Sequence, residues 1–62
     1  MWSKIEKLMK KRNVTVKQLS LCTEIGISTL NEWKNGKYKP GVDSLQKLAI
    51  FFDVPISYFL ED

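Results

Sequence analysis

The chain has 62 residues, of which 44% are hydrophobic, so it is long enough for one domain with one small core. It has a single cysteine and no histidine, which excludes an internal disulfide, a cysteine-rich zinc site and histidine-based general base catalysis. No apolar run approaches the ~20 residues of a membrane-spanning helix, so we expect a cytoplasmic protein with no membrane segment and no cofactor.

The net charge of +3 is distributed unevenly along the chain. Residues 1–39 hold nine Lys or Arg and three acids, a net charge of +6, whereas residues 40–62 hold one Lys and four acids, a net charge of −3. This asymmetry favours a protein that presents one basic face to a polyanion. Many cytosolic proteins are also mildly basic, so the charge alone does not identify the partner.

The first predicted helix opens at Ser3, because Glu6 three residues later completes the pattern of a capping box. Cations fill its last turn, where they stabilise the helix dipole, and Asn13 suits the left-handed conformation that ends a helix. Three apolar residues recur at helical spacing and should face the core: Ile5, Leu8 and Met9.

Two short helices joined by a tight turn are predicted next. Thr15 and Gln18 form another capping-box pattern, and this second helix runs to about residue 22 or 23. After a turn of about three residues, Leu30 and Trp33 lie three apart on one side of a third helix and can enter the core. Gly36 then tolerates the left-handed conformation that ends this helix. Two such helices, the second with a polar front, form the helix-turn-helix pattern.

A fourth helix is expected from about residue 42 to residue 52, after a loop that contains Pro40 and Gly41. Asp53 suits its left-handed end, and a last helical turn spans about residues 56–60. Ile50 and Phe51 lie off the core face of this helix, so they add apolar surface that is exposed or covered by a partner. The core face itself consists of four residues at helical spacing: Leu45, Leu48, Ala49 and Phe52.

A set of spaced residues gives the chain a resemblance to a known family. The set comprises Ile5-x-x-Leu8, Val14-Thr15-x-x-Gln18-Leu19-Ser20, Ser28-Thr29-Leu30-x-x-Trp33-x-x-Gly36-x-x-x-Pro40, Leu45-x-x-Leu48-Ala49-x-x-Phe52-x-Val54 and Leu60. Over nearly its whole length the chain resembles the Cro and lambda-type repressor domains, also called Xre-type helix-turn-helix proteins. The resemblance implies an all-α fold, a compact five-helix bundle with a central helix-turn-helix, and one DNA-binding domain over residues 1–62.

The resemblance also implies which residues touch double-stranded DNA. Ile27, Ser28 and Glu32 match positions that reach base edges in the major groove. Their chemistry is compatible with this role, since Ser28 can donate or accept, Glu32 can accept from cytosine N4, and Ile27 can contact a thymine methyl. The alternative is a solvated surface for Ser28 and Glu32, and a partly covered edge of the core for Ile27.

Further residues match positions that touch the DNA backbone or flank the base contacts. They are Thr15, Lys17, Thr29, Asn31, Asn35, Lys37 and Lys39. The lysines suit this role on chemical grounds as well, because cations near phosphates release counterions.

The chain departs from the family pattern at several positions. Glu24 stands in the turn where the family commonly has Gly, so a left-handed conformation there would cost on the order of 1 kcal/mol. Gly26 replaces a polar N-cap, and Val16 replaces a phosphate-binding Gln, so no side-chain clamp is expected at Val16. Leu21 and Cys22 stand where the family is usually polar, which predicts an unusual apolar patch on the second helix.

The function that the resemblance implies is a sequence-specific transcriptional regulator, expected to be a phage-type or mobile-element repressor that binds a near-palindromic operator. A homodimer is expected on the operator, with its contact surface formed by Tyr58, Phe59, Ile50 and Phe51. The alternative is a protein-interaction or antitoxin-like module of the same fold, which would use the exposed apolar residues. An enzyme is not expected, because Cys22 has no histidine to activate it and no phosphate loop is evident.

Overall fold

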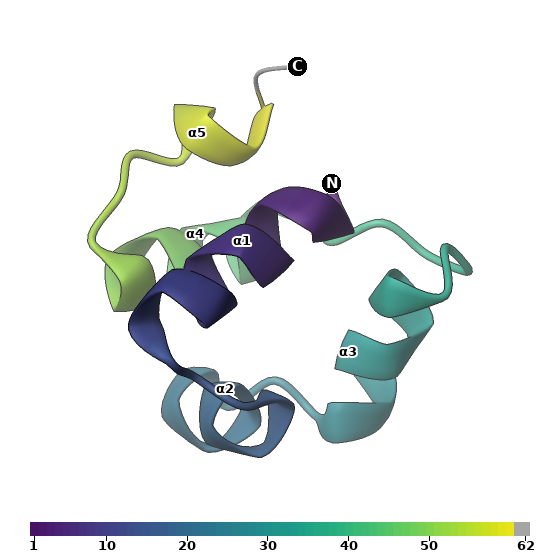
Figure 1. Ribbon diagram of the computed structural model, residues 1–62. Helices are drawn as coiled ribbons and strands as arrows, with labels where there is room; N and C mark the ends of the chain where they lie inside the picture. The colour runs from purple at the N-terminus through teal and green to yellow at the C-terminus, as the bar shows by residue number, and fades with distance from the viewer. Residues whose placement is uncertain (61–62) are drawn as a thin grey trace.

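The computed structural model describes residues 1–60, which contain five α-helices joined by short loops (Figure 1). In chain order they are α1 (Trp2–Arg12), α2 (Val16–Thr23), α3 (Ile27–Lys34), α4 (Val42–Phe52) and α5 (Ser57–Leu60). These residues include no β-strand, which confirms the predicted all-α fold with a central helix-turn-helix formed by α2 and α3. Two of the four acids in residues 40–62, Glu61 and Asp62, lie outside the described residues.

Most predicted helix boundaries are confirmed. Thr15 caps α2 in a reciprocal arrangement, since its Oγ1 accepts from the Gln18 N–H at 3.1 Å and its own N–H donates to Gln18 Oε1 at 2.9 Å. Asn13 and Asp53 adopt the left-handed conformation, with φ of 55° and 57°, and end α1 and α4. The final helix begins at Ser57, one residue later than expected.

The predicted capping box at the start of α1 is wrong. The helix begins at Trp2 with Met1 as its N-cap, and no side chain caps it. Trp2 is half-buried and packs against the core, so the helix extends back to include it. Ser3 consequently lies inside the first turn, where it cannot serve as the N-cap.

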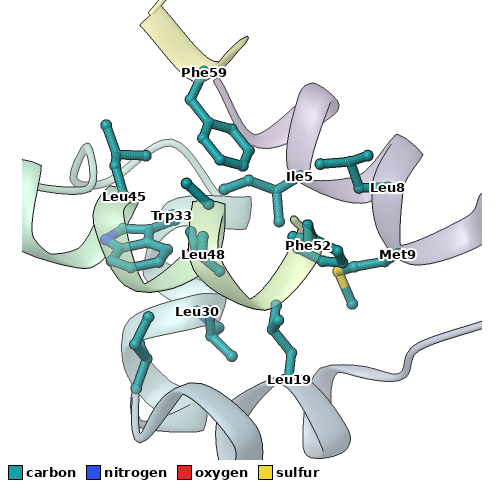
Figure 2. Close-up of a cluster of buried hydrophobic side chains, with 12 residues drawn as sticks. Ile5, Leu8, Met9, Leu19, Leu30, Trp33, Leu45, Leu48, Phe52 and Phe59 are labelled. Atoms are coloured by element: carbon teal, nitrogen blue, oxygen red, sulfur yellow. The ribbon is translucent and has the colours of Figure 1, made fainter. Parts of the chain in front are cut away.

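All five helices contribute to one apolar core (Figure 2). Trp33 is only 6% exposed and belongs to the same cluster as Leu19, Leu30 and Leu48, so its predicted place in the core is confirmed. The buried apolar residues are Ile5, Leu8, Met9, Leu19, Ile25, Leu30, Trp33, Leu45, Leu48, Ala49, Phe52 and Phe59. The four residues predicted for the inner face of α4 are therefore all buried.

The assignment of Phe59 to a contact surface between two copies is wrong. Phe59 is 2% exposed and points from α5 toward Ile5 (Figure 2). The reason is the placement of α5, which packs back onto α1 and is held there by Lys4 Nζ, a donor to the Tyr58 carbonyl at 3.1 Å. Phe59 therefore fills the single core. Of the two aromatic residues of α5, only the half-buried Tyr58 is accessible to a second copy.

A second long-range hydrogen bond joins the ends of α1 and α4. Arg12 Nη2 donates to the Phe52 carbonyl at 2.7 Å. This bond satisfies one of the carbonyls that a helix leaves free in its last turn and places a cation at the negative end of α4. Along residues 1–60, no helix combines the length and apolar character that crossing a membrane requires.

Candidate nucleic-acid interface

Helix α3 has an anchored back and a polar front. Leu30 is fully buried and Trp33 nearly so, so the two side chains fix the helix against the core. The opposite side carries two adjacent rows of residues spaced four apart, Ile27 with Asn31 and Ser28 with Glu32. A buried back and an exposed front leave a rigid helical face available to a partner.

The residues predicted to contact bases all lie on this front. Ile27 is 45% exposed and does not belong to the core or to the apolar residues packed against it, so it is not a covered edge of the core. Ser28 is exposed, whereas Glu32 is half-buried. Of the two residues predicted to flank them, Asn31 is exposed on the front and Thr29 is half-buried toward the Trp33 side.

The turn that presents α3 consists of Glu24, Ile25 and Gly26. Glu24 has φ of 60° and ψ of 23°, so the turn does require the left-handed conformation at a residue that is neither Gly nor Asn. Ile25 is buried and anchors the turn, and Gly26 serves as the N-cap of α3 with extended backbone. The turn therefore holds α3 firmly, at a conformational cost of about 1 kcal/mol at Glu24.

The start of α2 carries an exposed hydroxyl and an exposed cation, Thr15 and Lys17. The Thr15 oxygen accepts the Gln18 N–H, but its O–H hydrogen stays available to donate to another acceptor. Lys17 is exposed. Val16 is half-buried and packs against the core, so it cannot replace the phosphate-binding Gln of the family pattern.

The loop after α3 begins with a Schellman motif. The Lys37 N–H donates to the Glu32 carbonyl at 2.9 Å, and the Gly36 N–H donates to the Trp33 carbonyl at 3.1 Å. Gly36 has φ of 75°, so the predicted glycine stop is confirmed, while Asn35 before it caps the helix and is exposed. The motif fixes the direction in which the loop leaves the helix.

A comparison with protein-family models gives the decisive match. A family model described as Helix-turn-helix matches residues 5–59, which is most of the chain. The chain belongs to the Cro/C1-type, Xre-like helix-turn-helix family. It is accordingly a DNA-binding regulatory domain. Comparisons with curated proteins and with solved structures gave no significant match.

In this helix-turn-helix domain, the cations at the start of α2 and in the loop after α3 form no ion pair with an acid of residues 1–60. Lys17, Lys37 and Lys39 are all exposed, and the ion pair found in residues 1–60 joins Lys10 to Glu6 at 3.8 Å, on α1. The three lysines can therefore approach phosphates without first breaking an ion pair. Such contacts supply most of the salt-dependent affinity for DNA.

One exposed aromatic residue beside the candidate interface was not among the residues predicted from the sequence. Tyr38 of the helix-turn-helix domain is 59% exposed between two exposed lysines, and Lys37 Nζ lies 5.8 Å from the centroid of its ring. A tyrosine hydroxyl can donate to a phosphate oxygen. The sequence signal that could have identified it is the pattern Lys37-Tyr38-Lys39, an aromatic residue placed between two cations directly after α3.

Proposed function

We propose that this chain is a sequence-specific transcriptional repressor of phage or mobile-element type, and that it binds a near-palindromic operator with α3 in the major groove. The observation that carries the proposal is the division of α3 into an anchored back and an exposed front. A helix fits the width of the major groove, and its fixed front brings side chains to the base edges.

Three residues on the front of α3 are proposed to select the sequence. Ser28 accepts from or donates to a base edge, and Glu32 accepts from the N4 amino group of cytosine. Ile27 contacts a thymine methyl, a role that its exposed apolar side chain supports. Thr29 and Asn31 flank these contacts, and Asn31 is the more exposed of the two.

The phosphate contacts are proposed to lie on both sides of these base contacts. Thr15 and Lys17 contribute from the start of α2, where the helix dipole also favours an anion. The loop after α3 contributes Asn35, Lys37 and Lys39. Contacts on both sides would set the depth and orientation of α3 in the groove, because phosphate contacts position a protein without selecting a sequence.

The proposed assembly on DNA is a homodimer, to which each copy contributes the single domain proposed for residues 1–62. Two copies would occupy half-sites about one helical turn, roughly 34 Å, apart. Since the proposed ligand is DNA, we place the protein in the cytoplasm. With Phe59 in the core, Ile50, Phe51 and Tyr58 remain as the candidates for the pairing surface.

Selection of bound fragments from random DNA tests this function most directly. We expect an enriched motif with two inverted half-sites, and a changed motif for Ser28→Ala or Glu32→Gln, with the fold intact. Lys7→Ala, which removes an exposed cation from α1, is the control and should give the unchanged motif. Failure to enrich any sequence would contradict sequence-specific binding.

A protein-interaction or antitoxin-like module is a second candidate. It is favoured by the exposure of Leu21 and Ile50, which are 72% and 77% exposed. The two functions differ in their requirement for sequence. An electrophoretic shift that is the same with random and with genomic DNA would favour the interaction module, whereas a preference for genomic fragments would favour the repressor.

A further inference from the structure

A shallow apolar groove lies between the C-terminal ends of α2 and α4. Its volume is about 420 Å³. Six residues line it: Cys22, Thr23 and Glu24 from the end of α2 and the following turn, and Lys47, Ile50 and Phe51 from α4. Ile50 on its wall is 77% exposed, the highest value among the large apolar residues of residues 1–60. Such a surface is costly to leave in water.

An occupant of the groove does not have to supply a hydrogen-bonding group to the groove's interior. The Thr23 hydroxyl is buried and already donates to the Leu19 carbonyl at 2.6 Å, so it makes no demand on an occupant. Phe51 is half-buried and packs edge-to-face on Phe52, with ring centroids 4.9 Å apart, so its position is fixed by the core. The groove thus offers a firm apolar surface, and none of the residues proposed to contact DNA lines it.

The charges beside the groove favour one kind of occupant. Glu24 stands on the α2 side and Lys47 on the α4 side, and both are exposed. In the part of the chain that the structure describes, neither is in an ion pair. In a contact between two copies related by a two-fold axis, a residue that meets a second residue of the other copy is met in turn by that second residue's counterpart, so every contact away from the axis occurs twice. A patch with one acidic and one basic side chain can therefore pair with itself, since Glu24 of each copy can face Lys47 of the other.

We propose that a second copy of this chain docks on this groove through a two-fold contact, with apolar packing of Ile50 and Phe51 between two reciprocal Glu24–Lys47 pairs. The inference rests on the homodimer proposed above and names its surface. Tyr58 is excluded from that surface, because α5 and α2 lie at opposite ends of the bundle (Figure 1). The patch is small, so the pairing should be weak and depend strongly on concentration.

Charge reversal tests the pairing in the absence of DNA. Sedimentation of the unmodified chain from about 10 μM to about 1 mM should show a shift from monomer to dimer. Glu24→Lys leaves two lysines beside each groove, and Lys47→Glu leaves two glutamates. Like charges then face each other across the contact, so each variant alone should associate at least about tenfold more weakly. An equimolar mixture of the two variants should recover association, because the glutamates of one chain then face the lysines of the other.

Recovery in the mixture distinguishes a pair between copies from a pair within one copy, which mixing cannot restore. Ile50→Asp should weaken association at least about tenfold, since it places a charge in the apolar centre. Val42→Asp is the matched control, because Val42 is 66% exposed at the other end of α4 and does not line the groove. It should leave association unchanged.

Two results would overturn the inference. One is an unmodified chain that stays monomeric across the whole concentration range, which would leave the groove to another partner. The other is a mixture of charge variants that associates no better than either variant alone. Binding of DNA is measured separately by electrophoretic shift, so loss of pairing with retained DNA binding rejects only this groove. Retained pairing without DNA binding rejects only the proposed regulator.

Discussion

Replacement of Lys37 by Ala should flatten the salt dependence of DNA binding. Lys17, Lys37 and Lys39 are exposed cations beside α3 with no ion pair among residues 1–60, so each copy offers three phosphate contacts and a dimer offers six. Each neutralised phosphate contributes about −0.9 to the slope of log K against log salt, which gives roughly −5.4 for the unmodified dimer and roughly −3.6 for Lys37→Ala. From 50 to 200 mM salt these slopes correspond to losses of affinity of roughly 2,000-fold and roughly 150-fold.

The assay is a titration of operator and of random DNA at four or more salt concentrations. Lys37→Ala should weaken both kinds of binding by a similar factor, because a phosphate contact carries no sequence information. Lys7→Ala removes one exposed cation from α1 and is the matched control, with an expected slope unchanged from the parent. If both variants flatten the slope equally, the effect is one of total charge, and the loop after α3 has no specific role in holding phosphate.

Three further predictions concern the core, the turn and the recognition face. Trp33→Ala should cost about 3–5 kcal/mol of unfolding free energy, enough to unfold much of so small a domain; an unchanged thermal midpoint would remove Trp33 from the core. Glu24→Gly should stabilise the domain by about 0.5–1 kcal/mol and raise Tm by a few degrees, by more than Asn13→Gly, since Asn tolerates the left-handed conformation better. Glu32→Gln should shift base preference by about 1–3 kcal/mol at one position per half-site, and an unchanged sequence motif would exclude Glu32 from base contact.

Local chemistry in the sequence was sufficient to predict much of the fold. The bounds of α4 follow from Gly41 before it and Asp53 after it, and the start of α2 follows from the pairing of Thr15 with Gln18. Each of these signals acts over a few neighbouring residues, so tertiary structure had little opportunity to override it. The end of α3 at Gly36 is likewise determined by a local signal.

The two errors share a physical cause, which is contact between residues far apart in the chain. Burial of Trp2 against the core extended α1 past the predicted cap at Ser3. Phe59 entered the core because α5 docks on α1, where Lys4 bonds the Tyr58 carbonyl 54 residues away. A four-residue helix has too little periodicity to show which side faces inward, so the sequence could not place Phe59.

The candidate interface was predictable in its residue types but not in its exposure. Spacing and resemblance identified Ser28, Glu32 and Ile27, whereas only packing shows that Glu32 is half-buried and that Asn31 is the freer side chain beside it. The exposure of Tyr38 was not predictable, because an exposed tyrosine and a core tyrosine look alike in a sequence. Residue type limits which contacts are possible, and the anchored back of α3 determines which side chains can make them.

Glu24 connects the stability of the fold to the proposed pairing surface. Its left-handed conformation is strained, and a glycine at this position would relieve that strain. Among residues 1–60, Glu24 is the only acid that lines the groove between α2 and α4, and the same substitution would remove it. Glu24→Gly should therefore raise Tm while it weakens association of the two copies, so stability and pairing change in opposite directions. If the groove had no role, the variant would melt at a higher temperature with unaltered association, because relief of strain in the turn adds no contact between copies.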